Sequence, residues 1–277
     1  MKKFLIIGAV LATLTVSAAS AQQRLVRLTR YEGQRITGVS ASSAFDVQLV
    51  QSAGTKVVAE INEELEGNLN LSLGSDGIVR VSLNSMGVRN FRTRNSVLKV
   101  TVYLPELTYL KGSGAAEFYA NGNFNAPRTE IILGGAAELK SLQLRTGTLK
   151  LNCSGSAEAA LRCEADKADI QLGGAAEGDL FLRCDEAAVQ LSGAAELNLT
   201  GEAGRATMNV TSASELDAVG FAVKRLNVST ASAGEAKVWA IDALEAKATS
   251  ASSIRYKGNP GVFDTQSSSA GSVRRID

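Results

Sequence analysis

Apolar and polar residues alternate in short segments along most of the chain, and the same order of segments recurs. Three candidate core residues precede a glutamate by nine, seven and five positions, as Thr129, Ile131 and Leu133 precede Glu138. Apolar residues return one and three positions after the glutamate. Alternation with a period of two is typical of β-strands with one buried face. Each unit therefore predicts two strands joined by a run of small residues.

The units have nearly constant length. Their small-residue runs end at Glu117, Glu138, Glu158, Glu177, Glu196, Glu215, Glu235, Ser253 and Ser272. Successive positions in this series are 18 to 21 residues apart. A short fixed period without amphipathic helices indicates a repeat architecture. We predict an all-β fold, a parallel β-helix (solenoid) of about nine coils of ~19 residues stacked ~4.8 Å apart.

The small-residue run, such as "LGGAAEL" at 133–139, is expected to form a tight corner. Glycine supplies the backbone dihedrals that a bend needs. The residue two positions before the glutamate is always Ala or Ser, which suggests a small side chain packed inside the corner. We therefore expect Ala175 and Ala194 to be buried against each other in adjacent coils.

The segment before the repeats follows another pattern. We assign residues 106–277 to the β-helix and residues 22–105 to an N-terminal β segment that caps it in one continuous fold. Alternating runs at 69–73 and 79–83 flank "GSDG", which predicts a hairpin turn, and Pro105 ends a further strand. We interpret this segment as antiparallel strands that cover the open end of the solenoid. The arginine-rich loop at 85–95 is interpreted as a solvated hairpin tip, with a partner-binding arm as the alternative.

The first residues resemble a secretory signal peptide. Lys2 and Lys3 precede an apolar run, and Ala19-Ser20-Ala21 provides a cleavage site. We assign residues 1–21 to this peptide and expect an exported protein, located in the periplasm, on the outer surface or outside the cell. No later apolar run is long enough to cross a bilayer, so no transmembrane segment is expected after cleavage.

The amino-acid composition restricts the partners and the catalytic mechanisms that the chain can have. Removing residues 1–21 takes Lys2 and Lys3 from the 29 basic residues and leaves 27 against 28 acidic ones, so no nucleic-acid partner is expected. The chain has no histidine, which excludes a Ser-His-Asp hydrolase and makes most zinc enzymes improbable. Cys153 occupies a core position, whereas Cys163 and Cys184 lie in consecutive coils, where a disulfide is one alternative.

The corner motif Ser/Gly-Gly-Ala/Ser-Ala-Glu, repeated about every 20 residues, resembles the bacterial head GIN domain family of autotransporter adhesins. The segments "VSASSAFDVQLVQSAGTKVVAEINEELEGNLNLSL" and "VLKVTVYLPELTYLKGSGAAEF" also resemble that family. The resemblance covers about residues 36 to 277. It implies a right-handed parallel β-helix exported by a Gram-negative bacterium. Ser253 and Ser272 depart from the acidic corner pattern, and no translocator barrel is visible in the sequence.

Two outward rows are candidate binding sites. The acidic row comprises Glu117, Glu138, Glu158, Glu177, Glu196, Glu215 and Glu235. The polar row comprises Asn152, Gln171, Gln190 and Asn209. Stacked carboxylates repel each other. Either solvation or a calcium ion shared between neighbouring carboxylates would relieve this repulsion. Stacked amides hydrogen-bond along the axis or present a flat face to a ligand.

No catalytic or metal site is assigned, and no cofactor is expected, with calcium on the acidic row as the alternative. We predict a non-enzymatic adhesin or structural protein of the cell envelope that binds a glycan or protein, with self-association as a further option. The alternative is a polysaccharide-active β-helical lyase or hydrolase. Such enzymes use long loops that shape a cleft, whereas the coils here are short and uniform.

Overall fold

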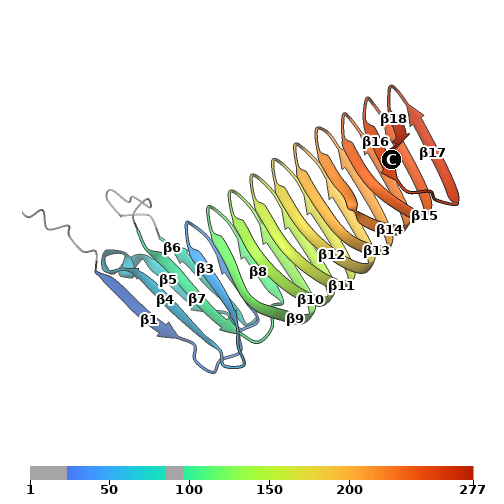
Figure 1. The fold of residues 1–277 in the computed structure, drawn as a ribbon. Coiled ribbons are helices and arrows are strands. Elements are labelled where there is room, and N and C mark those ends of the chain that lie inside the picture. The colour runs from blue at the N-terminus through green and yellow to red at the C-terminus, as the bar shows by residue number, and fades with distance from the viewer. Residues whose placement is uncertain (1–23, 85–95, 277) are drawn as a thin grey trace, which may run out of the picture.

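In the computed structural model, which describes residues 24–84 and 96–276, the chain forms an elongated β-solenoid with a smaller β segment at its N-terminal end (Figure 1). The predicted signal peptide and the 85–95 loop lie outside the described residues. All described strands belong to one continuous hydrogen-bonded network. Within the described ranges, no helix is long and apolar enough to cross a membrane.

Long, bent strands form the body of the solenoid, and each begins at a residue of the acidic row. They are β9 (Glu117–Leu133), β10 (Glu138–Cys153), β11 (Glu158–Leu172), β12 (Glu177–Leu191), β13 (Glu196–Thr211), β14 (Glu215–Ala231) and β15 (Glu235–Thr249). Successive strands pair in parallel, so each chain segment passes once round the solenoid before it reaches the next layer. The predicted solenoid of about nine ~19-residue coils is confirmed.

The core is a set of axial stacks. The expected series Leu133, Cys153, Leu172, Leu191 and Val210 lies in register in five successive coils, and all five side chains are buried. Period-two alternation places these side chains inside and their neighbours toward solvent. The predicted register of the solenoid is therefore correct.

The corners differ from the prediction in one respect. Ala175 and Ala194 are exposed, whereas the following residues Ala176 and Ala195 are fully buried. The exposed alanines link adjacent coils through their backbone, as the Ala194 N–H donates to the Gly174 carbonyl at 2.7 Å. The inward side chain is thus the one directly before the glutamate, and the prediction that Ala175 and Ala194 pack inside was wrong.

Glycine occupies the turning position of the corner, three residues before the acid, in the coils from Gly114 to Gly193, whereas serine occupies it from Ser212 onward, also with a positive φ. Gly174 has a φ of 75°, and a Cβ there would lie 2.8 Å from the Gly155 carbonyl oxygen in the coil below. Left-handed backbone of this kind favours glycine. In the coils around Gly174, the hydrogen-bonded stack of backbone turns therefore leaves no room for a side chain at this position.

The N-terminal segment contains both parallel and antiparallel pairs. Its elements are β1 (Leu25–Arg30), β2 (Gly38–Ala41), β3 (Asp46–Gln51), β4 (Lys56–Asn62), the 3-10 helix η1 (Glu63–Asn68), β5 (Leu69–Leu73), β6 (Ile78–Leu83), β7 (Leu98–Leu104) and β8 (Tyr109–Gly112). The hairpin predicted at "GSDG" joins β5 to β6, and β7 ends before Pro105 as expected.

The N-terminal segment is not the simple antiparallel cap that the sequence predicted, because most of its strands continue the parallel layers of the solenoid. Strands β2 and β3 form a complete layer that pairs in parallel with β8 and β9 on one side. On the other side they pair in parallel with β6 and β7, which come later in the sequence. Only β1, β4 and β5 add antiparallel strands to these layers in the described part of the chain. The first solenoid layer in the sequence is therefore the second in space.

The C-terminal end is formed by β16 (Ser253–Lys257), β17 (Val262–Ser268) and β18 (Ser272–Arg275). Every residue of β17 is exposed, although Phe263 is in register with the buried Leu244. No further described strand pairs with the outer edge of β17 or β18. The interior pattern becomes polar here, with Thr265 and Ser267 at positions that are alanines in β15.

Candidate functional site

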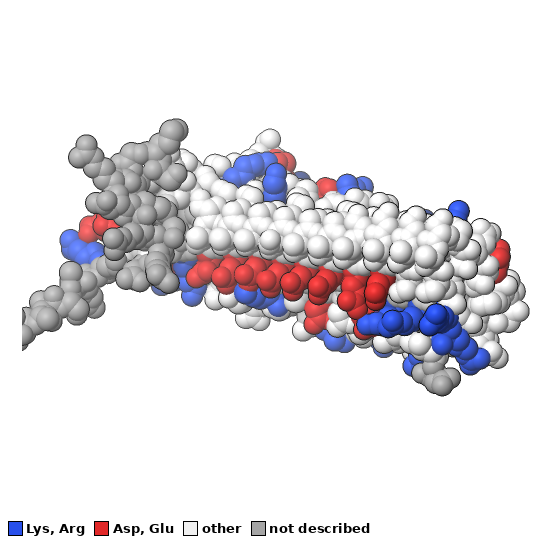
Figure 2. Space-filling model, turned by 90° about the horizontal axis from the view of Figure 1, so that it is seen from above, with Lys and Arg blue, Asp and Glu red and all other residues white. Residues whose placement is uncertain are grey.

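The acidic row runs straight along one side of the corner ridge (Figure 2). Strand pairing aligns Glu117, Glu138, Glu158, Glu177, Glu196, Glu215 and Glu235 in consecutive coils. The row also contains Asp46, which pairs in register with Glu117 and was missed in the sequence analysis. The signal was present, because in "SSAFD" small residues and then the buried Phe45 precede an acid, as small residues precede each glutamate of the row.

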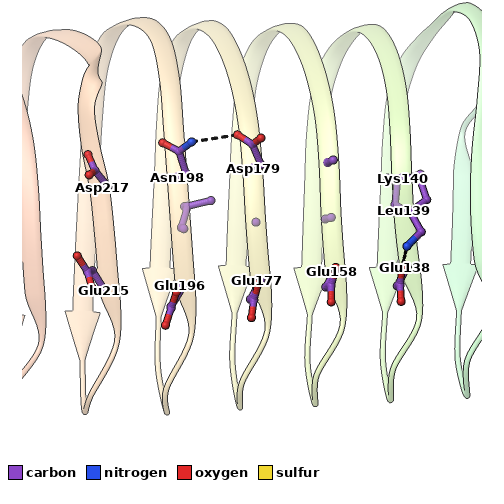
Figure 3. A pocket seen from close by; sticks show the side chains of 14 residues that line it. Glu138, Leu139, Lys140, Glu158, Glu177, Asp179, Glu196, Asn198, Glu215 and Asp217 are labelled. Atoms are coloured by element: carbon purple, nitrogen blue, oxygen red, sulfur yellow. Dashed lines mark hydrogen bonds and ion pairs between the residues drawn. The ribbon is translucent and has the colours of Figure 1, made fainter.

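A shallow groove of about 430 Å³ borders this row. On one side it is lined by carboxylates from Glu138 to Glu215 of the acidic row, as Figure 3 shows. A second row, two residues further along each strand, lies opposite and includes Asp179, Asn198 and Asp217. Ala160 and Gly178 leave the groove open in its middle section. The arrangement is an extended acidic furrow that spans five coils.

Charge compensation is concentrated at the ends of the furrow. The Tyr119 hydroxyl donates to Glu117 Oε2 at 2.8 Å, and Lys140 forms an ion pair with Glu138. At the other end, Lys237 Nζ lies 2.9 Å from Glu215 Oε1.

The middle of the acidic row has no such compensation. In the described part of the chain, Glu158, Glu177 and Glu196 form no ion pair, and all three are exposed. Like charges about 4.8 Å apart repel by roughly 1 kcal/mol in water. These carboxylates are therefore open to a cationic partner from outside the chain.

Other charged rows on the same solenoid are arranged differently. One row alternates Arg145, Glu164, Arg183 and Glu202 in successive coils, with ion pairs of 2.5 Å for Arg145–Glu164 and 3.3 Å for Arg183–Glu202. A second row places Glu186 between Lys167 and Arg205, and both cations pair with it. Both cations lower the pKa of Glu186 below its usual value. Unlike these rows, the acidic row does not neutralise itself.

Asp46 at the start of the acidic row has a raised pKa. Burial is the main cause, the neighbouring Glu117 raises the pKa further, and Lys99 opposes both effects. Among the residues that the structure describes, no three Asp, Glu or Cys side chains converge to form a metal site. The acids are spread evenly along the axis, whereas calcium prefers six to eight clustered oxygen ligands.

We expect calcium to leave the stability of the protein unchanged. Melting temperatures in calcium and in chelator should coincide, because the evenly spaced acids supply too few ligands to any one ion. Glu177→Gln should be neutral or slightly stabilising in both conditions, since it removes one repulsive charge from the row. Calorimetry of both proteins checks this. A calcium-dependent rise in melting temperature that Glu177→Gln abolishes would contradict it.

The polar row also lies in register along the axis. Asn152, Gln171, Gln190 and Asn209 align in four consecutive coils, with Gln190 and Asn209 exposed and the other two half-buried. Gln171 Nε2 donates to Asp169 Oδ1 at 3.2 Å, so this amide bonds within its own strand. The amide groups of Gln190 and Asn209 face solvent and are available to a ligand.

A second groove was not predicted from the sequence. It has a volume of about 400 Å³ and is lined by Asn123, Gln143, Arg162 and Phe181 in four consecutive coils, together with Arg183 and other residues. The Arg162 guanidinium lies 3.9 Å from the centre of the Phe181 ring. Amides, arginines and an aromatic ring make this groove chemically unlike the acidic furrow. Its residues differ from coil to coil, so repetition gave no signal for it.

The cysteines form no disulfide. Cys163 is in register with Leu182, whereas Cys184 is in register with Ala165, so the two side chains are offset by two positions. Burial raises the pKa of Cys153, Cys163 and Cys184 to about 12. Their thiolates are scarce at neutral pH, and thiol nucleophilic chemistry is disfavoured at all three positions.

We therefore expect the native protein to resist thiol reagents. At pH 8 a disulfide-exchange reagent such as DTNB should label the folded chain slowly, because attack requires the thiolate form. In denaturant all three thiols should react rapidly. Absorbance of the released chromophore measures both rates. Rapid labelling of one thiol in the native state would show that its side chain is accessible and ionised.

The chain matches known proteins in sequence and in fold. The sequence model of one family matches residues 35–181 and 164–260, and the family is described as "Putative auto-transporter adhesin, head GIN domain". A search of curated proteins finds no match to the chain.

Several crystal structures share the fold. A "putative adhesin" from Parabacteroides merdae is 22% identical with a TM-score of 0.69, over 92% of this chain and 98% of that one. A "putative adhesin" from Parabacteroides distasonis is 23% identical with a TM-score of 0.69 over the same shares. A "putative lipid binding protein" from Parabacteroides distasonis is 20% identical with a TM-score of 0.64, over 91% of this chain and 97% of that one. At these identities the likeness concerns the fold alone.

Proposed function

Because the chain belongs to the head GIN domain family of "putative auto-transporter adhesins", we propose that it is an exported, non-enzymatic β-solenoid that acts as an adhesin or structural protein of the cell envelope. Its partner is a glycan or a protein bound along the side of the rod. The family description supports an exported or surface location, and the solenoid supports contact over a long, straight surface.

One observation carries the proposal. Each outward row presents one side chain per coil at a fixed register, as in the polar row from Asn152 to Asn209. Such a row offers equivalent groups at ~4.8 Å intervals along a rigid body. An extended partner can contact several coils at once, so weak individual contacts add up without loop ordering. This geometry suits multi-point adhesion better than enclosure of a small substrate.

The polysaccharide-active enzyme is the competing function. Both main grooves are shallow surface furrows, and in the acidic one the carboxylates repeat along the axis instead of converging on one bond. A glycoside hydrolase uses two carboxyl groups that flank the scissile bond and differ in protonation. Glu158, Glu177 and Glu196 in the middle of the row are all exposed and without ion pairs among the described residues, so no two of them differ as an acid and a base would, which favours binding over hydrolysis.

Adhesion and catalysis are separated by one set of measurements. The secreted form should bind to a panel of immobilised glycans and surface proteins without releasing reducing ends or unsaturated products from soluble polysaccharides. In the native host, surface protease treatment of intact cells and fractionation should place the protein in the envelope or medium. Clear turnover of a polysaccharide, or retention in the cytoplasm, would overturn the proposal.

Matched variants locate the binding face. Gln171→Ala with Gln190→Ala removes two amides of the polar row, whereas Glu177→Gln with Glu196→Gln removes two charges of the acidic row. We expect the first pair to weaken ligand binding at least about tenfold, as expected when several weak contacts are lost together. Equal binding by both double variants and the unmodified protein would exclude these two rows as the ligand site.

A further inference from the structure

The face that carries the acidic furrow is electrically polarised along the solenoid. Figure 2 shows acidic side chains over most of its length and a basic group at the C-terminal end. Asp179, Asn198 and Asp217 of the row opposite the acidic row are followed in register by bases. These bases are Lys237, Arg255 and Arg274, in three consecutive coils.

Two members of the basic group lack internal partners, like the middle of the acidic row. Lys237 pairs with Glu215 and lies 3.9 Å from Asp217. Arg255 and Arg274 are exposed and form no ion pair with any residue of the described ranges. Among the described residues, this face therefore holds the unpaired acids Glu158, Glu177 and Glu196, with Glu235 also unpaired in the coil of Lys237, and further along the unpaired bases Arg255 and Arg274.

The spacing of these groups is self-complementary. Glu196, Glu177 and Glu158 lie one, two and three coils before Glu215. Lys237, Arg255 and Arg274 lie in the coils one, two and three steps after that of Glu215. A two-fold axis at the Glu215 coil, lying across the face and in its plane, brings Glu177 and Glu158 opposite the coils of Arg255 and Arg274 in a second copy. Glu196 comes opposite the coil that holds both Glu235 and Lys237.

The lateral fit also holds. The bases lie two residues further along their strands than the acidic row, a shift of ~7 Å that an extended arginine or lysine side chain spans. In the facing copy, Arg255 would lie over Asp179 and beside Glu177. Arg274 would lie over Ala160, where the furrow is open. At the axis, Lys237 of each copy neutralises part of the charge of Glu215 and Asp217.

We propose that two copies of this chain associate side by side and antiparallel, with the acidic furrow of each bound to the C-terminal basic group of the other. Two-fold symmetry makes each contact occur twice, as in other isologous interfaces. The surface is polar, and the strip spans seven coils, ~30 Å along the axis. The dimer is therefore weak and depends on ionic strength. This association goes beyond the proposed adhesive role and does not depend on the identity of the adhesive ligand.

Sedimentation velocity of the secreted form tests the dimer. In about 20 mM salt we expect a concentration-dependent shift from monomer to dimer, and in about 500 mM salt the monomer should dominate because the charges are screened. Glu177→Lys alone and Arg255→Glu alone should each raise the dimer dissociation constant at least about tenfold, since each places like charges opposite each other twice.

A charge swap provides the decisive result. An equimolar mixture of Glu177→Lys chains and Arg255→Glu chains should dimerise, because the two altered positions then face each other with opposite charges. In the same mixed dimer, Arg255 of the first chain still faces Glu177 of the second. The control Lys224→Glu reverses an exposed charge elsewhere on β14 and should leave dimerisation unchanged. Circular dichroism and melting curves verify that each variant is folded.

Several outcomes would overturn the proposal. One is an unmodified protein that stays monomeric at low salt up to about 100 μM, a concentration at which even weak association is visible. Folded single variants that dimerise as well as the unmodified protein would show that another surface mediates contact. Failure of the mixture to dimerise, with both chains folded, would exclude the antiparallel register even if a dimer exists.

Discussion

Gly174→Ala is expected to destabilise the solenoid by at least about 2 kcal/mol. Gly174 has a φ of 75°, which costs an L-residue with a side chain roughly 1–2 kcal/mol. The added Cβ would also lie 2.8 Å from the Gly155 carbonyl oxygen and 3.1 Å from the Gly155 nitrogen. Backbone cannot move aside here without breaking the hydrogen bond between Ala175 N and Gly155 O, which is 2.7 Å long.

Gly173→Ala provides the matched control for this change. A Cβ at Gly173 would meet only the Ser192 hydroxyl, at 3.3 Å, and a side-chain oxygen can rotate away. We expect a change of no more than about 0.5 kcal/mol, as for most surface substitutions. Chemical denaturation of both variants gives the two free energies of unfolding. Equal losses at Gly173 and Gly174 would refute the role of the left-handed corner.

Ala176→Leu is expected to destabilise the protein by about 1–3 kcal/mol, through overpacking of the corner interior. Ala176 is fully buried between Ala157 and Ala195, which occupy the same position in the adjacent coils and are also fully buried. The backbone holds these layers together, because the N–H groups of Glu177 and Glu196 donate at 2.9 and 3.0 Å to the carbonyls of Ala157 and Ala176. A larger side chain therefore has no space into which it can expand.

Ala175→Leu, one residue away, should have almost no effect on stability. The Ala175 side chain is exposed on the outer side of the corner, so a leucine there extends into solvent. Thermal or denaturant unfolding of the two variants under the same conditions compares them directly. A large loss for Ala175→Leu with none for Ala176→Leu would mean that the inward and outward sides of the corner are reversed.

The regular part of the fold follows from local sequence. Alternation identified the inward residues Leu133 and Leu172, and the spacing of the glutamates fixed which coils neighbour each other. Alternation also identifies the correct corner residue, since Ala176 lies an even number of positions before the buried Leu180, whereas Ala175 does not. The prediction of the inward residue was wrong because it relied on which position is always a small residue. Both corner positions hold small residues, but the Ala175 side chain is exposed and the Ala176 side chain is buried.

Features that depend on contacts between distant parts of the chain could not be predicted from local sequence. Asp46 follows the small residues of "SSA" and Phe45, so its place in the acidic row could be predicted, but its layer lies between strands that come later in the chain. Only pairing between distant segments determines that order. The Arg162–Phe181 groove was likewise missed, because its residues share a register position but no chemical type.

The layer formed by β2 and β3, which lies between strands that come later in the chain, affects how the chain folds during synthesis. Strands β2 and β3 are synthesised early, yet their parallel neighbours are β6 to β9, whose residues extend beyond position 98. An emerging N-terminal fragment therefore cannot complete this layer, and its closure depends on contacts of long sequence separation, which form slowly. Once β8 and β9 have docked, each later coil adds to a finished template through contacts only ~19 residues apart. Closure of the N-terminal layers is thus the long-range step of folding, whereas the repeats extend through local contacts.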